Sequence, residues 1–186
     1  MHYITKFIIA ISCAAISTAC NTQQTIGQKL DTYFNNVDGH FMGSIIVMKD
    51  GQTVYQRSIG YADVENQIPA TTETQYRIGS VSKMFTAVLV MKAAMEGRLS
   101  LNDPIAKYFP EAHILNDELI TIDHLLQHRS GVVDVVTQQT LAYLTYYRTP
   151  QTRQQMLEHI AAAGTNFLPG SSYRYSNSGY HLLAFI

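Results

Sequence analysis

The spacing of apolar residues in the first third of the chain predicts a helix followed by a β-hairpin. Apolar residues recur at helical spacing from Ile26 to Val37, which indicates an amphipathic helix. Two runs rich in β-branched residues follow, Gly43–Lys49 and Thr53–Ile59, and Asp50-Gly51 separates them. Asp-Gly between two such runs is a strong signal for a tight hairpin turn. A hairpin is only marginally stable alone, so we expect further strands or helices to pack against it.

A strongly apolar helix is predicted near the middle of the chain. The strand-like segment Tyr76–Ile78 leads through Gly79 into a helix that begins at Ser80 or Val81 and runs to Glu96, where Gly97 ends it. Apolar positions cover most of its circumference: Val81, Met84, Phe85, Val88, Leu89, Val90, Met91 and Met95. A helix that is apolar on nearly all sides is expected to be buried.

The last 85 residues show a helical pattern that prolines and glycines interrupt. It predicts helices over Ile120–His128, Leu141–Tyr147 and Gln151–Ala163, and a further helix that begins at Gly179. A turn is predicted at Leu168-Pro169-Gly170. The sequence contains no internal repeat.

The first twenty residues have the layout of an export signal rather than part of a fold. Lys6 precedes an apolar stretch from Phe7 to Ala19, which is too short for a permanent membrane-spanning helix. Cys20 follows the small residues Ser17-Thr18-Ala19. This order resembles the bacterial lipobox, in which the cysteine is lipidated and becomes the new N-terminus. The alternatives are an ordinary signal peptide cut near Ala19 or a short uncleaved anchor. We therefore expect an exported protein, membrane-anchored or periplasmic or extracellular.

These observations divide the chain into three parts: a signal at 1–19, a tether and first helix at 20–40, and one globular domain at 41–186. Apolar residues make up 46% of the sequence, which is enough for a core. The net charge is −1 without blocks of like charge, so nothing indicates a nucleic-acid partner. The two cysteines do not favour a metal site. His124 and His128 are four residues apart, but no third ligand is apparent, so no metal or other cofactor is expected.

The candidate chemistry begins with Ser80 and Lys83. A serine and a lysine three residues apart at the start of a helix lie on one face, so the amine can reach the hydroxyl and activate it as a nucleophile. Ser80 could instead be a helix N-cap, and Lys83 could be a side chain that extends to solvent at the helix end. Tyr175 and Asn177, a phenol and an amide two residues apart, form the second candidate group.

Five segments together resemble the serine β-lactamase and penicillin-binding-protein superfamily, in particular class C β-lactamases and their D-alanyl-D-alanine carboxypeptidase and esterase relatives. The similarity covers about Gly43 to the end of the chain. In chain order the segments are Asp50-Gly51 through Asp63, Tyr76 through Ala87, Leu99 through Pro104, Ile120 through Gly131, and Pro169-Gly170 through Tyr180. The resemblance implies an α+β fold, an α/β sandwich with a helical region in which helices flank an antiparallel sheet.

The resemblance also implies roles for the candidate residues. Ser80 would attack a carbonyl and form an acyl-enzyme, and Lys83 and Tyr175 would share the proton transfers. Asn177 would bind the amide side chain of the substrate, and the backbone N–H of Ser80 would supply half of an oxyanion hole. The division of the proton between lysine and tyrosine stays open.

The sequence departs from the family pattern at two places. Arg129 stands where the family usually has threonine in His-x-Ser-Gly. A Lys-Thr-Gly or His-x-Gly strand after the second motif is missing, and Lys49-Asp50-Gly51 lies before the nucleophile and cannot replace it. We therefore expect an N-terminal fragment in which the C-terminal strands are missing, whose own activity is doubtful.

The sequence leaves two functions open. The first is a serine hydrolase that acts through an acyl-enzyme on β-lactams, D-alanyl peptides or related amides and esters. We expect it to be a monomer without a nucleic-acid partner. The second is an inactive, truncated or degenerate relative that binds cell-wall peptide. The expected partners are accordingly a small-molecule or peptidoglycan-peptide substrate and, through Cys20, the membrane.

Overall fold

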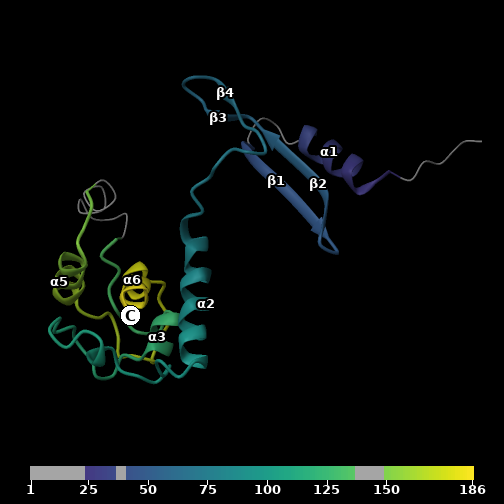
Figure 1. Ribbon diagram of the computed structural model, residues 1–186. Coiled ribbons are helices and arrows are strands. Elements are labelled where there is room, and N and C mark those ends of the chain that lie inside the picture. Colours follow the sequence, from purple (N-terminus) through teal and green to yellow (C-terminus); the bar gives the residue numbers. More distant parts are fainter. Residues whose placement is uncertain (1–23, 37–40, 137–148) are drawn as a thin grey trace, which may run out of the picture. The chain divides into compact units, whose positions relative to one another are not determined.

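The computed structural model describes residues 24–36, 41–136 and 149–186 (Figure 1). They fall into two compact units, one that ends at Tyr76 and one that begins at Arg77. Each unit is described by itself. Cys20 and the predicted helix Leu141–Tyr147 lie outside the described residues, as does Val37, and the division at 19 and 40 stays a prediction.

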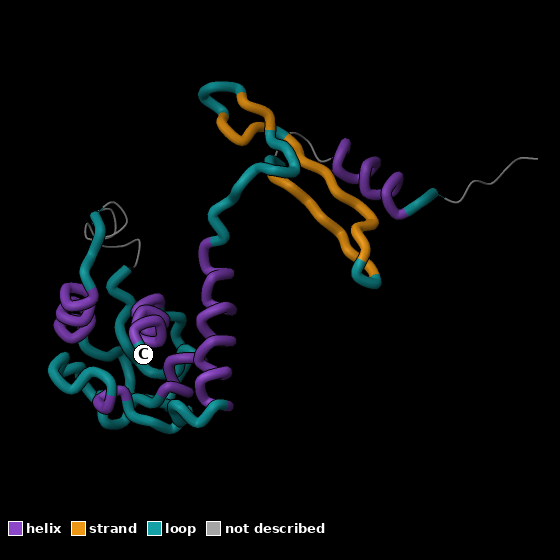
Figure 2. The backbone as a smooth tube through the Cα atoms, viewed as in Figure 1, coloured by secondary structure: helices purple, strands orange, loops and turns teal. Residues whose placement is uncertain are grey.

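The first unit contains a helix and four strands, and it confirms the predicted hairpin. Helix α1 spans Ile26–Asn36, and strands β1 (Gly43–Lys49) and β2 (Gln52–Ile59) pair antiparallel with Lys49 opposite Gln52. A second small antiparallel pair, β3 (Tyr61–Asp63) and β4 (Ile68–Pro69), lies in the segment that the sequence left without elements. Figure 2 shows both pairs in orange.

Helix α1 packs against β2 through aromatic rings and one polar cluster. The side chain of Tyr55 on β2 is buried, and its ring stacks on that of Phe34 with 6.5 Å between the ring centres. The Tyr55 hydroxyl donates to the Asp31 carboxylate at 2.9 Å, and Arg57 pairs with the same carboxylate at 3.1 Å. This helix is therefore the support that an isolated hairpin needs.

The second unit is helical in its described part, and its helices are joined by long loops (Figure 2). A 3₁₀ turn, η1, spans Gly79–Val81 and leads directly into α2, Ser82–Met95. The other elements are η2 (Ile105–Lys107), α3 (Ile122–Leu126), α5 (Arg153–Ala163) and α6 (Asn177–Phe185). The core consists of apolar side chains from these helices and from the loops between them: Val90, Ile105, Phe109, Ile114, Ile120, Ile122, Leu125, Val132, Met156, Leu157, Ile160, Leu182 and Leu183.

Polar side chains fix the starts of the helices in this unit. Thr121 and Thr152 each accept a hydrogen bond from the backbone N–H three residues later and form capping boxes at α3 and α5. Ser176 caps α6 in the same manner, and its hydroxyl accepts from the N–H of Gly179 at 3.1 Å. Because Ser176 is the cap, α6 begins at Asn177, two residues before the start that the apolar pattern predicts.

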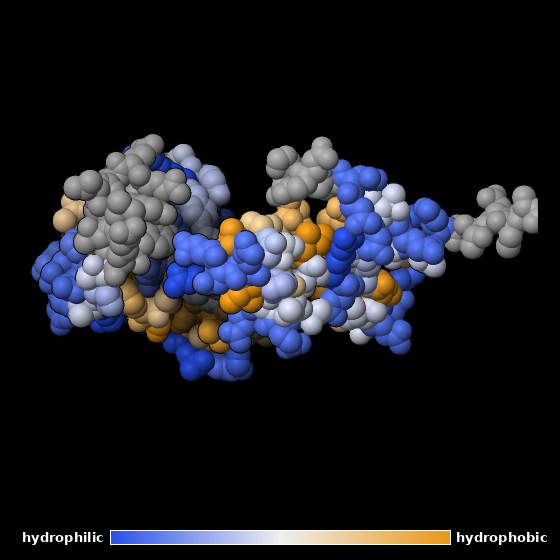
Figure 3. All heavy atoms as spheres, turned by 90° about the horizontal axis from the view of Figure 1, so that it is seen from above, coloured by the Kyte–Doolittle hydropathy of each residue, from blue (hydrophilic) through white to orange (hydrophobic). Residues whose placement is uncertain are grey.

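The expectation that the central helix is buried is wrong for most of its surface. Val90 is the buried residue of α2, where the helix packs against α6. Large apolar side chains on the rest of the helix are exposed: Met84, Phe85, Val88, Leu89, Met91 and Met95. Apolar side chains are visible in orange on the molecular surface in Figure 3. An apolar pattern on all sides shows that a helix can be buried on all sides. In the described structure α2 is buried at Val90, where it packs against α6.

One smaller expectation is also corrected, and the role of Arg129 becomes visible. Tyr76–Ile78, which resembles a strand in sequence, has no strand partner among the described residues. Arg129, the departure from the family pattern, binds the turn at Gly170 twice. Its carbonyl accepts from the N–H of Gly170 at 2.8 Å, and its guanidinium donates to the Gly170 carbonyl. Arg129 therefore joins the segment after α3 to the turn at Leu168–Gly170.

Candidate active site

Four side chains that the sequence singles out meet within the second unit. Ser80 lies in η1, Lys83 in the first turn of α2, Tyr175 just before α6, and Asn177 at the first position of α6. The Ser80 hydroxyl is 2.8 Å from the Tyr175 hydroxyl. The Lys83 ammonium donates to Ser80 Oγ at 3.2 Å and to Asn177 Oδ1 at 2.7 Å. Residues 95 positions apart in the sequence thus share one hydrogen-bonded cluster.

The surroundings of Ser80 rule out the N-cap alternative. Neither η1 nor α2 has a side-chain cap, and Ser80 Oγ contacts Tyr175 and Lys83 instead. Gly79 has a φ of 52°, a left-handed conformation that glycine adopts without strain and that turns the chain sharply into the helix. Ser80 is exposed, so its hydroxyl is accessible to a substrate.

Lys83 does not extend to solvent, which excludes the alternative of a solvent-facing side chain at the helix end. Its side chain is half-buried, and its ammonium lies 5.0 Å from the ring centre of Tyr175 and 5.7 Å from that of Tyr180. These distances permit cation–π attraction to both rings. Together with the hydrogen bonds to Ser80 and Asn177, they hold the amine inside the cluster.

The surroundings of Tyr175 favour the phenolate form of its side chain. Partial burial acts to raise the pKa of Tyr175, but its interactions with Lys83 and Ser80 and the positive charge of Lys83 outweigh burial and the opposing charge of Asp134. The pKa of Tyr175 therefore lies below its ordinary value, because the phenolate would be stabilised by the neighbouring ammonium. A phenol with this property can act as a general base.

The ring of His128 packs against the ring of Tyr175. Its ring centre lies 4.5 Å from that of Tyr175 and 5.0 Å from that of Tyr180, and its Nδ1 accepts from the backbone N–H of Ser176 at 3.2 Å. Its own backbone is in the left-handed region, with φ of 57°, which is uncommon for a residue with a side chain. Since Nδ1 must be unprotonated to accept this bond, His128 is neutral in this arrangement.

Burial lowers the pKa of His128, and the charge of Lys83 lowers it further, while Asp134 acts in the opposite direction. The neutral ring that the Ser176 hydrogen bond requires is therefore also the form that the surroundings favour. His124 has a different task, since its Nδ1 accepts from the N–H of Thr121 in the capping box of α3. Within the described ranges no group of three or more His, Cys, Asp or Glu side chains is arranged to hold a metal ion.

Sequence reasoning missed three residues of this site. Ser176 caps α6 and is buried, His128 supports the phenol, and Asp134 accepts two hydrogen bonds from Asn177. Ser176 had a usable signal, because a serine before a helical pattern is a frequent N-cap. Asp134 gave no signal, because its partner lies 43 residues away.

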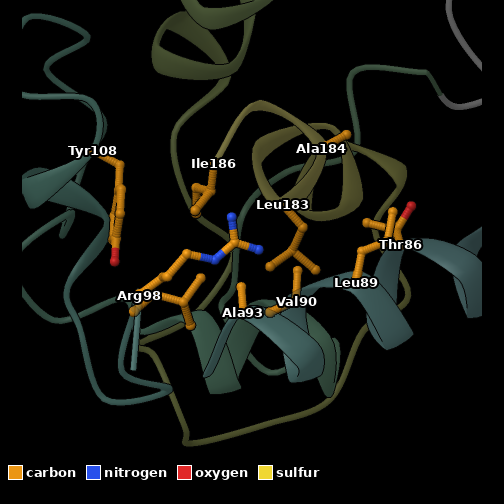
Figure 4. A pocket seen from close by; sticks show the side chains of 10 residues that line it. Thr86, Leu89, Val90, Ala93, Arg98, Tyr108, Leu183, Ala184 and Ile186 are labelled. Atoms are coloured by element: carbon orange, nitrogen blue, oxygen red, sulfur yellow. The ribbon is translucent and has the colours of Figure 1, made fainter. Parts of the chain in front are cut away.

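A hollow in the second unit is lined by other residues. It has a volume of about 380 Å³ and is lined by side chains of α2 and α6 and by the loops near them (Figure 4). Its lining residues are Thr86, Leu89, Val90, Ala93, Arg98, Leu99, Tyr108, Leu183, Ala184 and Ile186. None of the four clustered side chains lines it, so its size carries no argument about the chemistry at Ser80.

Comparison with known proteins decides the family. The family model described as Beta-lactamase matches residues 33–186. The chain belongs to the β-lactamase family. This confirms the resemblance and the α+β fold class that the resemblance implies, with helices and antiparallel strands both present.

Three known proteins illustrate what this chain is similar to. Protein flp of Staphylococcus aureus (strain COL) is 32% identical over 166 residues, which cover 86% of this chain and 32% of that protein. The octameric penicillin-binding protein homologue of Pyrococcus abyssi is 34% identical with a TM-score of 0.65, covering 76% of this chain and 33% of that one. The D-amino acid amidase of Ochrobactrum anthropi, solved with D-phenylalanine, is 27% identical with a TM-score of 0.66. The match covers 82% of this chain and 41% of that one.

This β-lactamase-family chain spans about a third of the length of the curated relative. The activity, substrates and partners of the whole protein are therefore proposals. No helix in the described part of the chain has the length and apolar character needed to cross a membrane. Lipidation at Cys20 falls outside the described residues and stays a prediction.

Proposed function

We propose that the protein is a serine hydrolase that works through an acyl-enzyme on Ser80. The observation that carries the proposal is the double contact of Ser80 Oγ, 2.8 Å from Tyr175 Oη and 3.2 Å from Lys83 Nζ. A serine hydroxyl is a weak nucleophile until a neighbouring base takes its proton. Ser80 has two candidate bases within reach, and the family to which the chain belongs agrees with this chemistry.

Ser80 Oγ attacks the carbonyl carbon of the substrate, and its proton passes to the Tyr175–Lys83 pair. The carbonyl oxygen becomes negatively charged in the tetrahedral intermediate, and in this proposal the backbone N–H of Ser80, in the 3₁₀ turn η1, donates a hydrogen bond to it. Collapse of the intermediate breaks the bond to the leaving group, which takes the proton from Tyr175. Water then attacks the Ser80 ester, releasing the acid product and restoring the hydroxyl.

The proposed substrates are β-lactams, D-alanyl peptides or related amides and esters, and the enzyme would meet them after its own export. The amidase solved with D-phenylalanine supports a carbonyl compound with a D-configured residue, since it shares this fold. The short apolar stretch before Cys20 supports export with a lipid anchor. The intact mass of the mature protein tests the anchor, because a lipidated Cys20 adds acyl groups and an ordinary signal cleavage does not.

Covalent labelling tests the nucleophile. The protein is expressed from its complete gene and treated with a fluorescent penicillin and with an alkyl fluorophosphonate, alongside Ser80→Ala and Ser82→Ala. Ser82 is the matched control, because its hydroxyl makes no hydrogen bond to the site among the described residues. Label on the wild type and on Ser82→Ala, but not on Ser80→Ala, is expected.

Equal labelling of Ser80→Ala would contradict the proposal, as would an unlabelled wild type. An unlabelled wild type that still binds peptidoglycan in a pull-down supports the inactive binding protein instead. The hydrogen bonds at Ser80 argue against that alternative, since a binding groove needs no activated hydroxyl.

A further inference from the structure

The carboxylate of Asp134 accepts two hydrogen bonds from Asn177, a residue of the second motif. Its Oδ2 accepts from the backbone N–H of Asn177 at 3.2 Å and from the side-chain Nδ2 at 2.9 Å. Asp134 lies in the loop after the His128–Gly131 segment, outside every motif that the resemblance rests on. It makes no hydrogen bond to Ser80 or Lys83 in the described structure. The hydrogen bonds that connect it to Lys83 run through Asn177, while its charge also acts directly on Tyr175.

The two neighbours of the Asn177 amide permit only one orientation. A carboxylate only accepts hydrogen bonds and an ammonium only donates them. The Nδ2 group must therefore face Asp134, and Oδ1 must face Lys83, whose ammonium donates to it at 2.7 Å. Without the Asp134 carboxylate, the side-chain amide of Asn177 could rotate by half a turn. Its N–H groups would then face the Lys83 ammonium, and the two groups of donors would repel each other.

The Asp134 carboxylate is itself held in place by the protein. Its Oδ1 accepts from the backbone N–H of Val136 at 3.0 Å, and the N–H of the intervening Val135 donates to the hydroxyl of Ser178 at 3.0 Å. Ser178 is fully buried in α6, one residue after Asn177. Three hydrogen bonds thus join this loop to the start of α6, two of them to the Asp134 carboxylate, and a fourth fixes the carboxylate within the loop. Asp134 is half-buried.

We propose that Asp134 is a positioning residue that fixes the side-chain amide of Asn177, so that Oδ1 of this amide holds the Lys83 ammonium beside Ser80. The inference rests on the proposed function, because it assigns a task within the same site. It also limits what Asn177 can offer a substrate. One of the two N–H bonds of Nδ2 is occupied by Asp134, so a single N–H remains for a substrate carbonyl.

The test measures the rate of covalent labelling by the alkyl fluorophosphonate in the protein expressed from its complete gene. For Asp134→Ala we expect a loss of about 10- to 100-fold, as for a lost hydrogen bond to a charged group and a misplaced catalytic amine. Asp134→Asn should lose less, because its carbonyl oxygen can still accept from Nδ2 of Asn177. Asp117→Ala is the matched control, a half-buried carboxylate of the same unit with no side-chain hydrogen bond among the described residues. It should label at the wild-type rate.

A double-mutant cycle separates positioning from general damage to the fold. Asn177→Ala is made alone and together with Asp134→Ala. If Asp134 acts through Asn177, the second substitution adds no further loss once the amide is gone. Independent, multiplying losses in the cycle would overturn the inference. So would wild-type labelling by Asp134→Ala, or equal rates for Asp134→Ala and Asp134→Asn.

The same assay distinguishes failure of this inference from failure of the proposed function. An unlabelled wild type, or label that persists in Ser80→Ala, contradicts the serine hydrolase itself. Labelling at Ser80 that is unaffected by Asp134 substitutions contradicts only the positioning role. If Asp134→Ala does not fold, Asp134→Asn with and without Asn177→Ala supplies the same cycle, with thermal unfolding as the check on folding.

Discussion

Gly131 offers the sharpest test of how the second unit is packed. Its φ is 77°, in the region that residues with side chains rarely adopt, and a Cβ placed there would overlap the backbone carbonyl oxygen of Phe167. The obstacle is backbone rather than the end of a flexible side chain, so the loop itself must shift. The carbonyl of Gly131 also accepts from the N–H of Asn166 at 2.7 Å, and the shift would strain this bond.

Gly97 provides a control with a similar positive φ and open surroundings. Its φ is 69°, and a Cβ added there would meet nothing within 4 Å. Gly97→Ala therefore measures the cost of the left-handed conformation alone, about 1–2 kcal/mol. Gly131→Ala carries the same cost plus that of the steric overlap, about 1–3 kcal/mol for forced repacking, so we expect a total of about 2–5 kcal/mol.

The assay is urea unfolding of both variants and the wild type, followed by circular dichroism and read as the change in the free energy of unfolding. Gly131→Ala should lower that free energy by clearly more than Gly97→Ala does. Equal losses, within about 0.5 kcal/mol, would show that the loop yields without cost. That result would refute the close approach of residues 131 and 167.

Two further predictions concern the phenol and the histidines. Tyr175→Phe removes the hydroxyl near Ser80 but keeps the ring against His128. We therefore expect acylation of Ser80 by the alkyl fluorophosphonate to slow by about 10²- to 10⁴-fold with little change in stability. An unchanged labelling rate would contradict the role of Tyr175 as a base. His128 and His181 both have a pKa that burial lowers below the ordinary value. The unfolded chain then binds more protons, so stability should be constant above about pH 6.5 and fall as the pH drops below it. Urea unfolding at pH 7.5 and 5.5 checks this, and equal or greater stability at pH 5.5 would contradict it.

Local signals were sufficient where the structure depends on neighbours in the sequence. The hairpin followed from two β-branched runs around Asp50-Gly51, and its pairing is antiparallel as expected. The pair Ser80 and Lys83 followed from helical spacing, since three residues bring two side chains to one face. In these cases the partner of each residue is fixed by the local geometry of the chain.

Long-range partners were not available from the same reasoning. Spacing alone could not bring Tyr175 to Ser80, and only the resemblance to a family connected them. The exposed side of α2 was misjudged for a related reason: an apolar circumference shows that a helix can be covered but does not identify what covers it. The role of Asp134 could not be predicted, because a single aspartate in a loop can accept hydrogen bonds from many groups. Only the structure identifies Asn177 as its partner.

The candidate site belongs to one unit, and this has a consequence for how its geometry is maintained. Ser80, Lys83, Tyr175 and Asn177 all lie after residue 76, and their hydrogen bonds run between η1, α2 and the start of α6. The start of α6 is fixed from within the same unit, by the Ser176 cap and by α3, which packs against α6. The distances among the four side chains are therefore set by packing and hydrogen bonds inside the second unit.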